Sequence, residues 1–155
     1  MKNLRIESFD LSSTYSKNEV FEVIAEQVGL KTSTEKSIIL NSLHQRENLA
    51  DTALIKGVAI PHIVIDTNKK PQLFIFKLLN PIQDWICLDG TYVDTLISIF
   101  CPKNISGYKK EIIELKKLFI TLSNEDIEDK ISRTSTSQEI IAILSEERGD
   151  SIDRN

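Results

Sequence analysis

One histidine in this chain lies where its ring could do chemistry. It ends the run G-V-A-I-P-H at positions 57–62, and residues 58–65 are almost wholly apolar and largely β-branched. Such a run is typical of a strand buried on both faces. Because proline donates no backbone hydrogen bond, Pro61 predicts an end, an edge or a bulge of that strand. His62 would then be presented from a stiff backbone at the rim of a sheet.

A histidine at such a rim could be a base, a nucleophile, a metal ligand or a packed structural group. A zinc site is the least favoured, because it usually needs four ligands, whereas Cys87 and Cys101 lie 14 residues apart and form no C-x-x-C pair. No G-x-S-x-G run indicates a serine hydrolase. The residue types alone leave the structural and the catalytic interpretations of His62 both open.

The composition narrows the class of protein. At 155 residues, with 41% hydrophobic and 27% charged residues, the chain is expected to form one soluble globular domain. A net charge of −4 argues against a nucleic-acid partner. No apolar run approaches the roughly 18 residues of a membrane span, and the first residues lack the apolar core of a signal peptide. We therefore expect a cytoplasmic protein with reduced cysteines and no direct membrane insertion.

Capping signals predict two helices before the histidine. Residues 4–11 should form a short strand or an extended lead-in. Ser16-Lys17-Asn18-Glu19 is a capping box that opens a helix, and Gly29 should end that helix as a left-handed cap. A second box at residues 32–35 opens a helix that should end near Arg46-Glu47.

Strands and turns are predicted after the histidine. The apolar runs at residues 73–79 and 95–101 should be central strands. Asn80-Pro81 and Asp89-Gly90 between them are turn signals.

From Ser106 onward the apolar period becomes helical, with a long helix first. Capping boxes at residues 123–126 and 136–139 should open two shorter helices. The order of elements predicts an α/β fold, a single layered domain with a mixed β-sheet and helices on both faces. Residues 1–148 would form this domain, and residues 149–155 a flexible tail.

The residues around His62 resemble the active-site motif of a known family. This is the fructose/mannitol-type enzyme IIA (type 2) family of the bacterial phosphoenolpyruvate-dependent sugar phosphotransferase system. The resemblance covers roughly residues 4 to 145. Its motifs are Arg46-Glu47, Asp51-Thr52, G-V-A-I-P-H at 57–62, Leu79-Asn80-Pro81-Ile82 with Asp84-Trp85, Asp89-Gly90, Val93-Asp94, Pro102 and Leu115-Lys116-Lys117-Leu118.

The resemblance implies that His62 is the phosphorylated nucleophile. Arg46 would stabilise the phosphoryl group through its planar guanidinium. Thr52 and Gly57 would help to bind phosphate, with the 52–57 backbone amides as an anion nest. Neither a metal nor a cofactor is implied. The implied partners are the histidine-containing phosphocarrier protein, which supplies the phosphoryl group, and a cysteine of a separate enzyme IIB, which receives it.

A loop and a single helix residue depart from the family pattern. The family's loop reads roughly S-T-G-I-G-N-G, whereas residues 51–57 read D-T-A-L-I-K-G. A loop that needs positive φ there must therefore be rebuilt or strained. Glu111 aligns with a second histidine of many family members, and its carboxylate could either repel the phosphate or orient the imidazole. His44 is expected on a helix surface rather than as a second phosphorylation site.

Two functions remain open from the sequence. One is a phosphocarrier, a phosphotransferase component for sugar uptake. The other is a regulatory enzyme IIA-like protein that signals its phosphorylation state by binding other proteins, without sugar transport. The departures in the loop and at Glu111 add weight to the second function, but the phosphocarrier remains the favoured interpretation.

Overall fold

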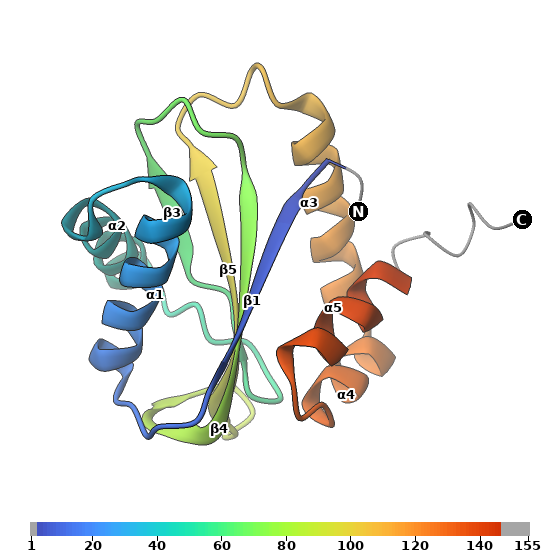
Figure 1. Cartoon of the computed structure of the whole chain (residues 1–155). Coiled ribbons are helices and arrows are strands. Elements are labelled where there is room, and N and C mark those ends of the chain that lie inside the picture. Colours follow the sequence, from blue (N-terminus) through green and yellow to red (C-terminus); the bar gives the residue numbers. More distant parts are fainter. Residues whose placement is uncertain (1–2, 147–155) are drawn as a thin grey trace, which may run out of the picture.

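A mixed five-stranded sheet separates two layers of helices in the computed structural model, which describes residues 3–146 (Figure 1). The strand order is β1-β4-β5-β2, and β3 also pairs with β5. Strand β4 runs parallel to β1 and antiparallel to β5, while β2 and β3 run parallel to β5. The strands are β1 (Arg5–Leu11), β2 (Val58–Ala59), β3 (His62–Ile65), β4 (Gln72–Ile86) and β5 (Tyr92–Pro102).

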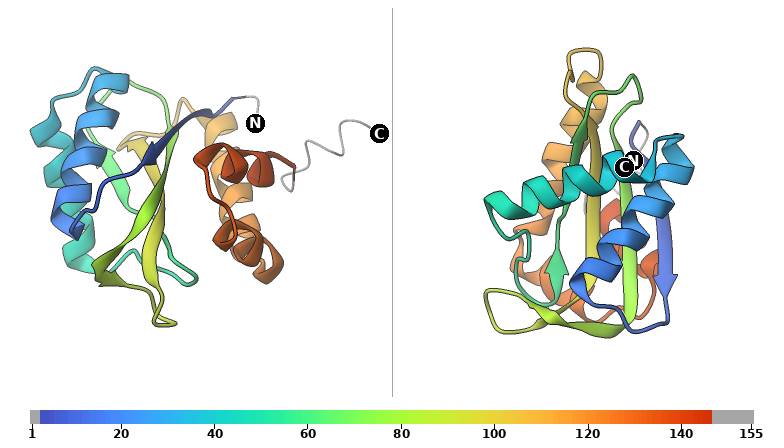
Figure 2. Two further views of the ribbon diagram at one scale, coloured as in Figure 1. Left: turned by 60° about the horizontal axis from the view of Figure 1, so that its bottom comes forward. Right: turned by 90° about the vertical axis from the view of Figure 1, so that its left-hand side faces the viewer.

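Helices cover both faces of this sheet. Figure 2 shows α1 and α2 on one side and α3, α4 and α5 on the other. The helices are α1 (Lys17–Thr32), α2 (Lys36–Leu49), α3 (Lys109–Leu122), α4 (Glu125–Ser132) and α5 (Ser137–Ser145). This arrangement confirms the α/β fold class and the single layered domain that the order of elements predicted.

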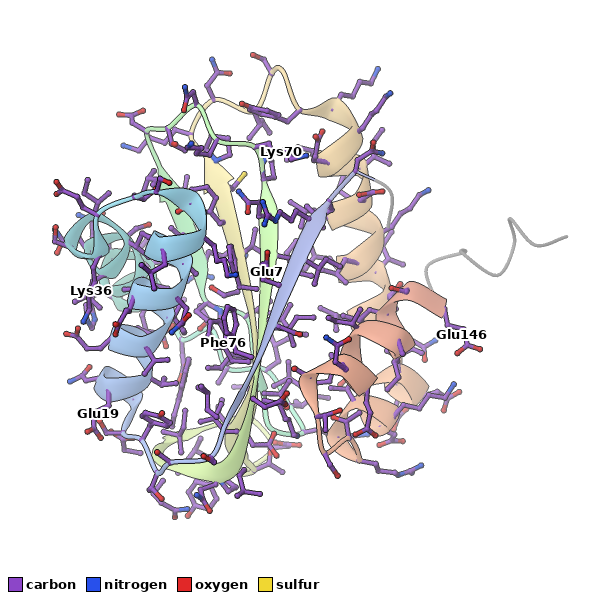
Figure 3. The ribbon with its side chains drawn as sticks, in the orientation of Figure 1. Glu7, Glu19, Lys36, Lys70, Phe76 and Glu146 are labelled. Carbon is purple, nitrogen blue, oxygen red and sulfur yellow. The ribbon has the colours of Figure 1, made fainter. Side chains whose placement is uncertain are left out.

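The alternation of side chains along β4 supplies both cores. Phe74 and Phe76 belong to the core under α1 and α2, whereas Leu73 and Ile75 belong to the core under α3, α4 and α5, as the two-residue period of a strand requires. Figure 3 shows Phe76 between the sheet and α1. Its ring stacks on Phe9 of β1, with the centroids 4.9 Å apart.

The proline before the histidine divides the strand, as predicted. β2 ends at Ala59 and β3 begins at His62, and both pair with β5. The Pro61 carbonyl accepts hydrogen bonds from the Ile99 amide (3.3 Å) and the Ser98 hydroxyl (3.0 Å). The break therefore leaves the chain attached to β5 on both sides of the proline.

The prediction that Gly29 ends the first helix was wrong. α1 continues to Thr32, and Ser33 is the left-handed residue, with φ 52°. A side chain at Gly29 would lie 2.7 Å from the carbonyl oxygen of Thr34, so glycine there allows the chain to fold back closely. The capping box at residues 32–35 was also wrong, because Glu35 is the N-cap of α2 and its side chain makes no capping hydrogen bond.

Asn80-Pro81 is not a turn. β4 runs through it, and two shifts of register against β5, between Lys77 and Ile86, absorb the proline as bulges. The turn at Asp89-Gly90 is confirmed, since Gly90 has φ 84° and lies between β4 and β5.

Among the later helix starts, the capping box at Thr136 is confirmed, as is the one at Ser16. Asn124 rather than Ser123 caps α4. The expected tail at 149–155 lies outside the described residues. Within residues 3–146, no helix is both long enough and apolar enough to cross a bilayer.

Candidate active site

His62 is the first residue of β3, at the edge of the sheet beside α2. Its half-buried side chain lines a cavity of about 250 Å³. The other residues lining it come from the C-terminal half of α2 and from β3: Ser42, Gln45, Arg46, Leu49 and Val64. The imidazole and the guanidinium that the resemblance named thus face one space.

A side-chain clamp between α2 and β3 brings them together. The Val64 amide donates to Ser42 Oγ (2.9 Å), and Ser42 Oγ donates to the Val64 carbonyl (3.2 Å). Arg46 follows Ser42 by one helical turn, about 6 Å along the axis. His62 precedes Val64 by two strand residues, about 6.6 Å on the same face. Because the two spacings match, fixing Ser42 on Val64 places Arg46 alongside His62.

The site favours the neutral form of the imidazole. Burial is the main cause that holds the pKa of His62 below its ordinary value, and the positive charge of Arg46 adds to it. Hydrogen bonding to the Ile60 backbone acts in the opposite direction and raises the pKa of His62. Nδ1 itself is buried and makes no hydrogen bond within residues 3–146. A neutral imidazole retains the lone pair that a nucleophile needs.

Phe119 of α3 forms an offset stack with this imidazole. The two rings are nearly parallel, 7° apart, with their centroids separated by 6.1 Å. Phe119 also lines an apolar groove of about 410 Å³, together with Leu54, Ile55, Ile60, Leu88, Leu122, Ser123 and Glu128. The apolar period that predicted the long helix gave no sign of this contact between Phe119 and His62.

Thr52 is buried and already bonded. Its hydroxyl and its amide both donate to Glu47 Oε1, at 2.7 and 3.1 Å. Glu47 Oε2 also forms a salt bridge with Lys17 Nζ, at 2.7 Å. Arg46 and Glu47 thus have different roles, since Arg46 lines the cavity while Glu47 holds the loop after α2. A phosphate contact from the Thr52 hydroxyl would require it to exchange this partner.

Most backbone amides of the 52–57 loop are also occupied. Ala53 donates to Asp51 Oδ1 (2.9 Å), Leu54 to the Val58 carbonyl (2.8 Å) and Lys56 to Asp89 Oδ2 (2.9 Å). Trp85 Nε1 donates to the same Asp51 oxygen at 2.9 Å. As placed, these amides serve the loop itself rather than an anion.

Gly57 holds a tight turn at the start of β2. Its φ is 78°, and a Cβ there would lie 2.7 Å from Asp94 Oδ1. Its amide donates to the Thr91 hydroxyl (2.9 Å), and its carbonyl accepts from the amides of Asp94 (2.9 Å) and Thr95 (3.0 Å). Lys56 before it has φ 53° without being glycine, so the loop that lost its glycines keeps a left-handed residue.

Glu111 and His44 lie away from this arrangement. Glu111 is in the first turn of α3, eight residues before Phe119, which corresponds to about 12 Å along the helix. The helix position that reaches the imidazole therefore carries Phe119. The ring of His44 packs against Phe21 on the α1 side, with centroids 5.3 Å apart. In the described part of the chain, no three His, Cys, Asp or Glu side chains gather as a metal site would require.

Curated relatives are similar in sequence to this chain over most of its length. It is 28% identical over 138 residues to the PTS system 2-O-alpha-mannosyl-D-glycerate-specific EIIABC component of Escherichia coli (strain K12), covering 86% of this chain but only 20% of that protein. It is 28% identical over 130 residues to a nitrogen regulatory protein of Pseudomonas aeruginosa, covering 83% and 82%. The chain thus spans a fifth of the first relative and most of the second.

Solved structures share the fold. The nitrogen regulatory protein IIA-Ntr from Neisseria meningitidis superposes with a TM-score of 0.71 at 27% identity, covering 88% of this chain and 92% of that one. A complex of enzyme IIAMtl with phosphorylated enzyme IIBMtl from Escherichia coli gives a TM-score of 0.61 at 17% identity, covering 88% and 93%. The family model described as "Phosphoenolpyruvate-dependent sugar phosphotransferase system, EIIA 2" matches residues 3–147. The chain belongs to this EIIA family.

Proposed function

We propose that this chain is a phosphocarrier whose His62 accepts a phosphoryl group from the histidine-containing phosphocarrier protein and passes it to a cysteine of a separate enzyme IIB. The observation that carries the proposal is an imidazole with Nδ1 buried, beside a guanidinium at an open cavity, where burial and Arg46 hold the pKa of His62 below its ordinary value. Membership of the EIIA family supports the same assignment.

The chemistry needs one ring nitrogen and a cation. Because Nδ1 is buried, Nε2 is the nitrogen whose lone pair would attack phosphorus. The new N–P bond at His62 forms as the N–P bond of the donor's phosphohistidine breaks. A cysteine thiolate of enzyme IIB then forms an S–P bond to the same phosphoryl group as the N–P bond at His62 breaks. Such transfers depend on alignment and charge compensation more than on covalent help.

Arg46 is suited to that compensation. One of its N–H groups donates to the Ala50 carbonyl (2.8 Å) at the end of α2. A guanidinium carries five donors, so this bond holds the side chain while other donors can meet the phosphoryl oxygens. Arg46 would then stabilise the phosphohistidine and lower the barrier to transfer.

The surroundings of His62 suit a protein partner better than a small substrate. Large apolar side chains near the cavity and the groove are strongly exposed, with Leu49 84% and Leu88 88% accessible. Exposed apolar surface of this kind is typical of docking sites. In the groove, Glu128 Oε2 is buried without a hydrogen-bond partner in the described structure. A donor from a docking protein would satisfy it.

A regulatory role is the second candidate. The observation that favours it is that this chain covers 82% of a nitrogen regulatory protein at 28% identity. In that case the phosphorylation of His62 would change the binding of a target protein without delivery of phosphate to a sugar.

Phosphorylation in vitro tests the site. Incubation with phosphoenolpyruvate, enzyme I and the histidine-containing phosphocarrier protein should add one phosphate, detected by intact mass under alkaline conditions. His62→Gln should abolish this addition, whereas the matched control His44→Gln should retain it. Arg46→Ala should fold normally and slow the transfer. Phosphate retained by His62→Gln would refute the assignment.

The same assay separates the two roles. A purified enzyme IIB should discharge the phosphoprotein within seconds to minutes if the chain serves transport. Normal phosphorylation on His62, with no discharge to any IIB of the same organism, would favour the regulatory role.

A further inference from the structure

The contact between Phe119 and His62 has a geometry suited to an in-plane nucleophile. The two rings lie 7° from parallel. An offset, nearly parallel ring limits rotation of the imidazole and displaces water from part of one face. The nitrogen lone pairs lie in the ring plane, so they stay available at the edge. Stacking therefore restrains the ring without blocking attack through Nε2.

The rest of α3 holds Phe119 in place. Leu115, Leu118 and Leu122 on the same helix are buried in the core under the sheet. Phe119 itself is 36% exposed and stands between that core and the apolar groove. Its position is thus set by anchored neighbours and not by its own burial.

We propose that Phe119 is a positioning residue for His62, which limits rotation of the imidazole and shields part of one of its faces while Nε2 stays open to the cavity beside Arg46. This inference rests on the proposed function, in which His62 is the phosphoryl acceptor. In this role Phe119 acts through the imidazole and does not touch the phosphoryl group, although it also lines the groove at which a partner would dock.

Two effects of Phe119 on the protonation of His62 oppose each other. Shielding from water favours the neutral ring, whereas a phenyl face near an imidazolium favours the charged ring by a cation–π interaction. Burial is the largest cause of the lowered pKa of His62, and Arg46 of α2 is the charged group that acts on it. Removing the phenyl ring should therefore raise the pKa of His62.

The test compares Phe119→Ala and Phe119→Leu with Ile113→Ala. Ile113 lies on the same helix, is 43% exposed and lines neither the cavity nor the groove. Two measurements are made on each folded variant. NMR titration of the ring protons gives the pKa of His62, with His44→Gln assigning the signals. Single-turnover transfer at varied concentrations of the phospho-donor protein separates the maximal rate from the half-saturating concentration.

Phe119→Ala should raise the pKa of His62 and lower the maximal transfer rate about tenfold, because misorientation of a reacting group costs rate. Phe119→Leu should keep the low pKa, since it still excludes water, but should lose about threefold or more in maximal rate. Ile113→Ala should change neither quantity.

Three results would overturn the proposal. One is a wild-type pKa and rate in Phe119→Ala. Another is a raised half-saturating concentration with an unchanged maximal rate, which would make Phe119 a docking residue only. The third result applies if Phe119→Ala does not fold. A wild-type maximal rate in Phe119→Leu would then overturn the proposal. The titration needs no phosphorylation, so a wild-type protein that accepts no phosphate would refute the proposed function separately.

Discussion

Replacing Ser42 by alanine should loosen the contact that places Arg46 beside His62. The Ser42 hydroxyl makes two hydrogen bonds to Val64, at 2.9 and 3.2 Å, and is largely buried. Each such bond contributes about 1 kcal/mol net. Alanine, however, has a higher helix propensity than serine by about 0.5 kcal/mol. The net loss in the free energy of unfolding should be about 1.5 kcal/mol.

Ser37→Ala on the same helix is the matched control. Ser37 is exposed, and its side chain makes no hydrogen bond among the described residues. The control therefore gains helix propensity without losing a hydrogen bond. The free energies of unfolding of the two variants should differ by about 2 kcal/mol. Urea unfolding followed by circular dichroism measures both. Ser42→Ala should also slow phosphoryl transfer to His62, whereas Ser37→Ala should not.

A difference below about 0.5 kcal/mol between the two variants would mean that water or another group replaces Ser42 at the strand edge. The matched spacing along α2 and β3 would then fail as the explanation for where Arg46 lies. Unchanged transfer in a destabilised Ser42→Ala would instead show that other contacts of α2 hold Arg46 in place.

Three further predictions follow from the same region. Because burial and Arg46 lower the pKa of folded His62, the unfolded chain binds more protons below about pH 6.5. The urea midpoint should therefore fall as pH drops through that range, and less so in His62→Gln; parallel curves would contradict this. Gly57→Ala should cost about 2 kcal/mol or more in urea unfolding, because a Cβ at φ 78° would lie 2.7 Å from Asp94 Oδ1. Lys56→Gly should be tolerated, because φ 53° suits glycine, and a lower melting temperature than that of Gly57→Ala would contradict this.

Local patterns predicted those parts of the fold that depend on neighbouring residues. Pro61 divides its strand because a proline can donate no ladder bond, and this holds in any tertiary setting. The capping boxes at Ser16 and Thr136 form because both partners lie within one turn. The role of Gly29 was misjudged because it depends on a contact formed only in the folded chain. Glycine is needed there because the carbonyl of Thr34 packs closely against the helix. Asn80-Pro81 was misjudged because pairing with β5 draws the proline into a bulged strand.

The site was predictable only as far as motif resemblance reached. His62 and Arg46 were named from the sequence, but their common cavity depends on the register of α2 against β3, and no local pattern encodes it. Ser42 sets that register through its hydrogen bonds to Val64, and nothing in the helix pattern of the sequence singled it out. Glu111 was assigned from alignment, whereas the helix face that reaches the imidazole is fixed by how α3 packs on the sheet.

The loop at residues 51–57 shows how a changed sequence alters the division of work at the site. The carboxylates of Glu47, Asp51 and Asp89 accept hydrogen bonds from backbone amides of this loop. Lys56 adopts a left-handed conformation that glycine would adopt with less strain. Amides that bond these carboxylates cannot also bond a phosphate. Compensation of the phosphoryl charge should therefore fall more heavily on Arg46 than in a relative whose loop amides are free. A large loss of transfer rate in Arg46→Ala, with little loss in Thr52→Val, is the outcome that this arrangement requires. The reverse order would show that the loop opens and turns its amides to the phosphate.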